Sequence, residues 1–384
     1  MNSTTNSRVY FDYAATTPID PRVRAAMERV REDAAYNPSS PHAEGRRSRA
    51  LLDAARERVA RVLGVPRRSI VFTAGGTESN NLALFGVARA AGSRRHVVTS
   101  VIEHHAVSRA VDTLEDAGFA VTRIPVDASG RVDPATFAAA LRPDTAIASV
   151  MYANNEIGTV QSLAQIGEYA RANGIPFHTD AVAAAGWLPL EIEDLGVDLL
   201  SLAAHKFYGP PGIGVLYLRD GTALEPMLAG GSQELGRRAG TEDVAAAIGM
   251  AEALELAETE RPEAVCRIQA LRDGLESSVV ASIAGARPNG TGGSRLPNIA
   301  SVTFAGTDPA ALLMLLDLHG FAVSAGSACT SGSLEPSQVI TAIGGDVRGA
   351  TIRFSLGRPT TEEEVDRLVA VLPQIVADAG PVET

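Results

Sequence analysis

Short runs of β-forming residues alternate with helix-like segments between about Ser69 and Leu218. When strands are connected by helices along the chain, they favour a largely parallel sheet with helices packed on its faces. The predicted fold class is therefore α/β. The expected strands span residues 69–74, 96–101, 146–152, 176–180, 198–203 and 214–218.

The chain has 384 residues, which exceeds the length at which a single hydrophobic core usually stops growing. We therefore expect a large domain over residues 21–260 and a smaller α/β domain over residues 261–384, with residues 1–20 packing against the small domain. A helical pattern from Thr241 to about Val280 crosses the expected boundary, and an amphipathic helix is predicted over residues 49–63.

Charge and composition argue against several classes of protein. A net charge of −11 argues against direct binding of nucleic acid, which relies on clustered positive charge. The chain lacks an apolar run long enough for a membrane span, and its first residues lack the pattern of a secretory signal, so a cytoplasmic protein is expected. Two cysteines cannot form a disulfide framework or a thiolate zinc site, and no ligand spacing suggests a metal.

Lysine is rare in this chain: of the 34 Lys and Arg residues, only Lys206 is a lysine. A buried lysine can lose its proton and form a Schiff base with a carbonyl compound, whereas an arginine stays protonated. Lys206 follows a predicted strand and enters a Gly- and Pro-rich turn, a rigid position where its pKa could fall. The alternative is a lysine that survives by chance in an Arg-rich chain.

A Gly-rich turn after the first predicted strand is a candidate phosphate site. Gly75, Gly76 and Thr77 lie between that strand and a helix predicted over residues 82–91. Small residues at a helix N-terminus let backbone N–H groups approach an anion, and the Thr77 hydroxyl adds a donor. Taken alone, the same residues are also typical of a tight turn with a helix cap.

Two further polar residues follow strands at the expected carboxyl edge of the sheet, where α/β proteins bind ligands. Asp180 could keep a pyridine nitrogen protonated, which lets a pyridoxal ring accept electrons. His104 could stack on such a ring and move protons. As isolated residues, Asp180 could instead cap the next helix and His104 could be a hydrogen-bonded structural residue.

Cys329 and Arg353 are candidates for the substrate side of such a site. Cys329 lies in a run of small residues, 324–333, that cannot fill a core and is typical of a loop. Arg353 lies in an apolar strand context, where a partly buried guanidinium could bind a carboxylate or form an interface salt bridge. Cys266 lies in a helical pattern and is predicted to act as a small apolar residue.

Together these motifs resemble the NifS/IscS-type cysteine desulfurases, which belong to the class V aminotransferase group of fold-type I enzymes. Enzymes of this fold type are transferases and related enzymes that use pyridoxal 5′-phosphate (PLP). The resemblance covers nearly the whole chain. It also rests on YFDYAATTP at 10–18, NPSS at 37–40, NNEIG at 154–158 and RFSLGR at 353–358.

The resemblance implies a homodimer that converts L-cysteine to L-alanine and leaves the sulfur on Cys329 as a persulfide for a sulfur-acceptor protein. Lys206 would hold PLP as a Schiff base and, once displaced, move protons. Asn37, Asn155 and Arg353 would bind the substrate, and Thr241 would reach the PLP phosphate of the partner subunit. The implied PLP-binding residues are Gly76, Thr77, His104, Asn155, Asp180, His205, Lys206 and Thr241, and the implied catalytic residues are Lys206, Cys329 and His104.

Two positions depart from the family pattern. Ala183 stands where the family usually has Gln, and Ala203 where it usually has Ser or Thr. By strand alternation, position 203 should still face the site. A lost hydrogen bond to a charged group is worth about 1.5–3 kcal/mol, so PLP retention could be roughly ten- to a hundredfold weaker. The sequence thus predicts a working but specialised desulfurase.

Two alternatives stay open from the sequence. A PLP-dependent lyase, epimerase or aminotransferase of the same fold would not use Cys329. A non-catalytic sulfur-relay scaffold would show no bound PLP even after the cofactor is added. The sequence does not identify the sulfur acceptor.

Overall fold

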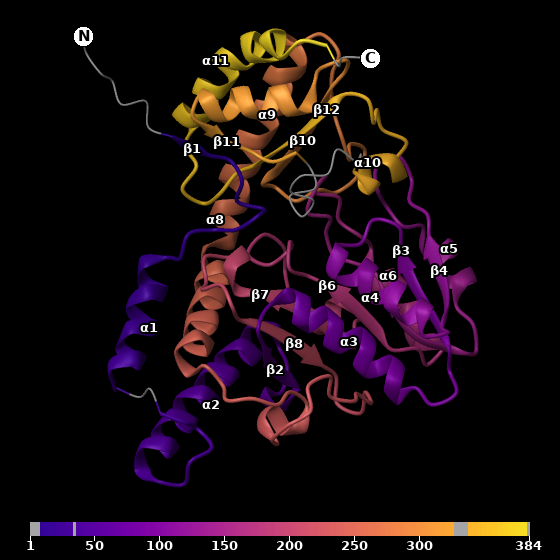
Figure 1. The fold of residues 1–384 in the computed structure, drawn as a ribbon, viewed down its shortest axis with the longest axis vertical. Helices are drawn as coiled ribbons and strands as arrows, with labels where there is room; N and C mark the ends of the chain where they lie inside the picture. Colours follow the sequence, from indigo (N-terminus) through magenta and orange to yellow (C-terminus); the bar gives the residue numbers. More distant parts are fainter. Residues whose placement is uncertain (1–7, 34–35, 326–336, 382–384) are drawn as a thin grey trace.

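A seven-stranded sheet forms the centre of the large domain in the computed structural model, which describes residues 8–33, 36–325 and 337–381 (Figure 1). The strand order is β2-β8-β7-β6-β5-β3-β4, and every strand except β8 runs in the same direction. The strands are β2 (Ile70–Thr73), β3 (His96–Ser100), β4 (Ala120–Ile124), β5 (Thr145–Ser149), β6 (Phe177–Asp180), β7 (Leu199–Ala203) and β8 (Gly214–Leu218).

All six strands predicted for this region are present, and the mostly parallel sheet is confirmed. The sequence did not predict β4, which lies at the edge of the sheet beside β3. Most β4 side chains are at least partly exposed, and Arg123 is among them. The strand therefore lacks the continuous apolar run that marks the buried strands.

Helices cover both faces of this sheet. One buried group joins α3 (Gly76–Ala90) and α4 (His105–Asp116) to strand residues such as Val71. The other group includes Phe72 and residues of α2 (Ala43–Leu63), α6 (Leu163–Ala172) and α8 (Val244–Ser282). Side chains alternate across a strand, so the neighbours Val71 and Phe72 belong to opposite faces. The remaining helices of this domain are α1 (Pro21–Asp33), α5 (Pro134–Ala140) and α7 (Ile192–Leu195).

The predicted amphipathic helix is confirmed as α2, and local chemistry fixes both of its ends. The His42 side chain accepts a hydrogen bond from the Gly45 N–H and caps the start. Gly64, with φ +66°, ends the helix in the left-handed conformation that glycine adopts most easily. The helix begins earlier than predicted, at Ala43.

The C-terminal part of the chain forms a second, antiparallel sheet of order β12-β10-β9. Its strands are β9 (Ala286–Pro288), β10 (Ile299–Phe304) and β12 (Ala350–Ser355), accompanied by α9 (Pro309–Leu318), α10 (Gln338–Ala342) and α11 (Glu362–Ala379). Near the N-terminus, β1 (Val9–Tyr10) pairs in parallel with β11 (Phe321–Ala322).

The long helix α8 spans the two parts of the molecule. α8 packs against α1 and α2 at one end and against α11 and β10 at the other (Figure 1). Residue 260, where the domain boundary is expected, lies inside α8, two residues before Pro262. The connection is therefore helical on both sides of that position.

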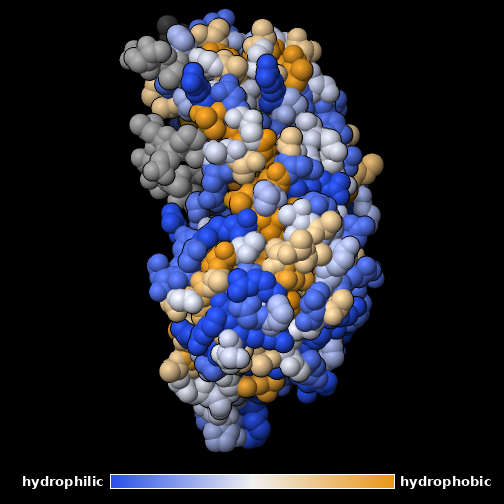
Figure 2. All heavy atoms as spheres, turned by 90° about the vertical axis from the view of Figure 1, so that its right-hand side faces the viewer, coloured by the Kyte–Doolittle hydropathy of each residue, from blue (hydrophilic) through white to orange (hydrophobic). Residues whose placement is uncertain are grey.

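A small apolar cluster attaches α10 to the large domain. Val339 and Ile340 of α10 pack with Ile102, Met151 and Ile157 from the segments that follow β3 and β5. On the face that Figure 2 shows, most residues are hydrophilic, and apolar residues gather along its middle. None of the helices in the described part of the chain is both long and apolar enough to cross a membrane.

Candidate active site

Most of the predicted site residues meet at one edge of the large sheet. The parallel strands place them there because each follows, or lies at, the carboxyl end of a strand, where α/β folds bind ligands. They line a cavity of about 260 Å³. The predicted residues that line it are Gly76, Thr77, His104, Asn155, Asp180, His205 and Lys206.

Close packing around the Gly-rich turn leaves little room for a side chain at Gly76 or at Gly214 of the neighbouring strand β8. α3 begins at Gly76 itself, earlier than the predicted start at residue 82. A Cβ atom on Gly76 would lie 2.8 Å from Cγ2 of Val182, and one on Gly214 would lie 2.6 Å from the carbonyl carbon of Gly75. The first turn of α3, including Thr77, therefore lies against the cavity and offers a helix N-terminus suited to an anion.

Lys206 follows β7 in a short 3-10 turn, η2 (Ala204–Lys206). Its Nζ donates hydrogen bonds to the carbonyl oxygens of Ala14 and Ala15, the latter at 2.8 Å. His205 approaches the same segment, with its Nδ1 3.1 Å from the Thr16 hydroxyl oxygen. Burial, with the nearby Lys206 charge, lowers the pKa of His205 to about 4, so its ring is neutral at pH 7. The N-terminal segment thus lies against the lysine.

Asp180 lies at the end of β6 and is 5% exposed. Its Oδ2 accepts a hydrogen bond from Asn80 Nδ2 (2.6 Å), and its Oδ1 accepts one from the Val182 N–H (3.0 Å). The sequence did not single out Asn80, although it lies one helical turn after Gly76. That spacing on α3 is the signal that could have identified it.

His104 was predicted to be either a hydrogen-bonded structural residue or a residue of the site, and in the structure it is hydrogen-bonded and also lines the cavity. It caps α4, where its Nδ1 accepts a hydrogen bond from the Ala106 N–H (3.1 Å). Nδ1 is an acceptor, so the proton of the neutral ring lies on Nε2. Burial lowers the pKa of His104, Asp180 opposes this shift, and Lys206 adds to it.

Arg353 lines a second cavity of about 240 Å³, which shares Ala15, His104, Asn155 and Lys206 with the first. Arg353 is 1% exposed, more deeply buried than the sequence predicted. It donates to the carbonyl oxygen of Asn155 (2.8 Å) and to Oδ1 of Asp12 (2.9 Å). Its Nε is buried without a hydrogen-bond partner among the described residues.

Asp12 is a residue to which the sequence assigned no role. Its carboxylate compensates the buried charge of Arg353 across 341 positions of sequence. Only the motif at residues 10–18 hinted at it, because nothing local links Asp12 with Arg353.

Asn37 and Thr241 are not brought to Lys206 within one chain. Both are exposed and line a separate cavity of about 270 Å³. Cys329 lies outside the described residues. Cys266 lies on α8, in agreement with the predicted helical pattern, and it is exposed.

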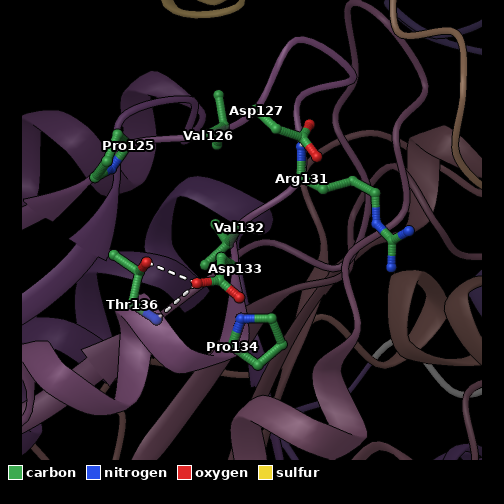
Figure 3. Close-up of a pocket in the computed structure, with 8 residues that line it drawn as sticks. All are labelled: Pro125, Val126, Asp127, Arg131, Val132, Asp133, Pro134 and Thr136. Atoms are coloured by element: carbon green, nitrogen blue, oxygen red, sulfur yellow. Dashed lines mark hydrogen bonds between the residues drawn. The ribbon is translucent and has the colours of Figure 1, made fainter.

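A larger cavity, of about 390 Å³, lies between the end of β4 and the start of α5 (Figure 3). Its carboxylates accept hydrogen bonds from neighbouring residues of the same segment. Asp133 caps α5 by accepting from the Thr136 N–H (3.0 Å) and hydroxyl (2.8 Å), and Asp127 accepts from the Arg131 N–H (2.9 Å). The described residues include no group of three or more His, Cys, Asp or Glu that could hold a metal. The lysine cavity is therefore the better candidate.

The fold and this cavity define a class of α/β protein with a half-buried lysine at the carboxyl edge of a mostly parallel sheet. The family described as aminotransferase class-V matches residues 9–368, and the chain belongs to this family. The predicted fold class and family resemblance are thereby confirmed.

Individual proteins and solved structures of this family are also similar to the chain. Cysteine desulfurase IscS of Dictyoglomus turgidum is 46% identical over 371 residues, which cover 96% of this chain and 94% of the relative. A solved NifS-like protein superposes with a TM-score of 0.90 at 37% identity and covers 97% of this chain and 100% of its own. A structure described as SspA in complex with cysteine has a TM-score of 0.80 at 35% identity, covering 92% of this chain and 99% of its own.

Proposed function

We propose that this protein is a PLP-dependent cysteine desulfurase, which converts L-cysteine to L-alanine and transfers the sulfur to Cys329. The observation that carries the proposal is the position of Lys206. The only lysine of the chain lines one cavity with Asp180 and the N-terminus of α3, and a second cavity with Arg353. The names of the relatives support cysteine as the substrate.

The residues of the first cavity fit PLP. Lys206 would hold the aldehyde carbon, the Asp180 carboxylate would face the pyridine nitrogen, and Gly76 and Thr77 would bind the phosphate. His104 and Asn155 would line the ring, and the buried Oδ1 of Asn80 lacks a partner among the described residues. When bound, PLP supplies an electron sink that stabilises negative charge on the substrate carbon.

The chain's own groups account for the rest of the reaction. Arg353, which lines the second cavity, would orient the cysteine carboxylate, and Lys206 Nζ would move a proton at the substrate α-carbon. The sulfur of Cys329 forms a bond to the substrate sulfur as the carbon–sulfur bond breaks. The electron pair of the broken bond stays with the β-carbon of the substrate, and protonation of that carbon gives alanine.

A homodimer and a sulfur-acceptor protein complete the proposal. The exposed position of Asn37 and Thr241, in a cavity apart from Lys206, supports a site to which a second subunit contributes. The persulfide on Cys329 would then pass its outer sulfur to the acceptor.

Product analysis tests this function. With PLP and L-cysteine, the purified protein should form one alanine for each sulfur released to a thiol reductant. A lyase would give pyruvate and ammonia, an aminotransferase would need an oxo-acid, and an epimerase would give D-cysteine. Absence of any product with PLP present would favour the scaffold.

Replacing Arg353 with Lys should raise the KM for cysteine by roughly ten- to a hundredfold, because a hydrogen bond to a charged group is worth about 1.5–3 kcal/mol. Lysine keeps the charge but lacks the planar, two-pronged donor geometry. Arg358→Lys is the matched control, because Arg358 pairs with Asp20 and Glu260 and does not line the cavity. An equal KM for Arg353→Lys and the wild type would contradict the assignment.

Replacing Ala203 with Ser should strengthen PLP retention by roughly ten- to a hundredfold, since it adds one donor beside the phosphate position. A Cβ on Gly76 would lie 3.4 Å from the Ala203 Cβ, so the new hydroxyl would lie beside the first turn of α3. PLP release during dialysis, followed by visible absorption, measures the effect. Ala74→Ser places a hydroxyl near the same turn but outside the cavity, and should change nothing.

A further inference from the structure

Glu103 is a buried carboxyl group beside the substrate cavity, and the proposed reaction gives it no task. It lies between β3 and α4, directly before His104, and is 1% exposed. It lines the cavity of about 240 Å³ together with Lys206 and Arg353. A carboxyl group buried this deeply is rare unless it is paired or uncharged.

The two oxygens of Glu103 have different surroundings. Oε1 accepts hydrogen bonds from the Ser100 hydroxyl (2.5 Å) and from the Met151 N–H (3.0 Å). Oε2 is enclosed and has no hydrogen-bond partner among the described residues. Two donors on one oxygen and none on the other suit a neutral carboxylic acid that carries its proton on the second oxygen.

The environment also favours the neutral form. Ile102, Met151 and Ile157 belong to the apolar cluster around this segment. Burial raises the pKa of Glu103 to about 8, the hydrogen bonds from Ser100 and Met151 oppose this shift, and the Asp180 charge adds to it. The other titratable or charged residues that line the two cavities are His104, His105, Glu156, His205, Lys206 and Arg353.

We propose that Glu103 is a positioning residue that works as a neutral acid and holds the Met151 and His104 walls of the cofactor cavity. This inference rests on the proposed function. Met151 and His104 both line that cavity, and Glu103 contacts the first through its side chain and precedes the second in the chain. Ionised Glu103 would instead carry a buried negative charge whose Oε2 has no hydrogen-bond donor among the described residues, and relief of that charge by donors or water would displace the walls that Glu103 holds.

Unfolding of the cofactor-free protein tests the neutral acid without any turnover. The stability from neutral Glu103 is fully present below the ordinary pKa of 4.5 and is lost as the pH rises through about 8. Glu103→Gln keeps an oxygen acceptor for Ser100 and Met151 but cannot ionise. Its melting temperature relative to the wild type should rise by about 2 °C or more between pH 5 and pH 8. A constant difference across this range overturns the neutral acid.

The pH profile of alanine formation tests the positioning role. Above pH of about 8 the wild-type rate should fall roughly tenfold per unit, whereas the Glu103→Gln rate should stay within about twofold of its value at pH 7. Ser100→Ala removes a donor that favours the carboxylate, so its decline should begin at a higher pH. The same decline in all three proteins overturns the positioning role. A wild-type protein that forms no alanine at any pH contradicts the proposed function itself, and with it the positioning role.

Discussion

Lys206→Ala and Lys206→Arg variants will form alanine from L-cysteine at least about a thousandfold more slowly than the wild-type protein, because a positioned general base alone is worth roughly 10²–10⁴-fold. The variants also lose the covalent anchor for PLP. Arg keeps a positive charge near the Ala14 and Ala15 carbonyl oxygens, so it separates the loss of charge from the loss of a reactive amine.

Rates are compared at saturating PLP, and unfolding midpoints show whether the variants fold. Added methylamine should restore part of the activity of Lys206→Ala, since it replaces the missing amine in the vacated volume. If Lys206→Arg kept more than about a tenth of the wild-type rate, the amine would not be the reactive group.

Replacing Cys329 with Ser should abolish persulfide formation and reduce alanine formation at least about a hundredfold, because a hydroxyl is a far poorer acceptor of sulfur than a thiolate. PLP binding should be unchanged. Mass spectrometry of the protein after exposure to cysteine, before and after reduction, detects the added sulfur. Cys266→Ser is the matched control, because Cys266 lies on α8 and lines neither the Lys206 nor the Arg353 cavity.

The products formed by Cys329→Ser, and the cysteine that carries the persulfide in the wild type, discriminate between the possible mechanisms of enzymes with this fold. Full alanine and sulfide release by Cys329→Ser would remove the Cys329 persulfide from the mechanism, whereas sulfide release with pyruvate and ammonia in place of alanine would favour a PLP-dependent lyase. A persulfide on Cys266 in the wild type would show that Cys266, and not Cys329, accepts the sulfur.

Much of the fold could be predicted because its signals are local. The buried strands β5 and β7 are short, largely apolar runs bounded by turns or helices. The edge strand β4 was missed because its exposed face removes the apolar run. The exposure of Cys266 could not be predicted, because a helical period alone does not say which face of the helix packs.

Part of the candidate site could also be predicted from local signals, and part could not. Lys206, Asp180 and His104 could be proposed because each follows a strand whose carboxyl end must reach the same edge. The contacts that connect distant segments could not. Arg353 pairs with Asp12, Asp180 accepts from Asn80, and Glu103 contacts Met151, all through packing that no sequence spacing encodes.

Reductive trapping tests the central claim most directly. Borohydride treatment of the PLP-loaded protein, followed by digestion and peptide mass spectrometry, locates any bond between the cofactor and an amine. Because the chain has one lysine, the account predicts a single phosphopyridoxyl group on the peptide that contains Lys206. An adduct on the N-terminal amine alone, or no adduct in a folded protein at saturating PLP, would contradict it.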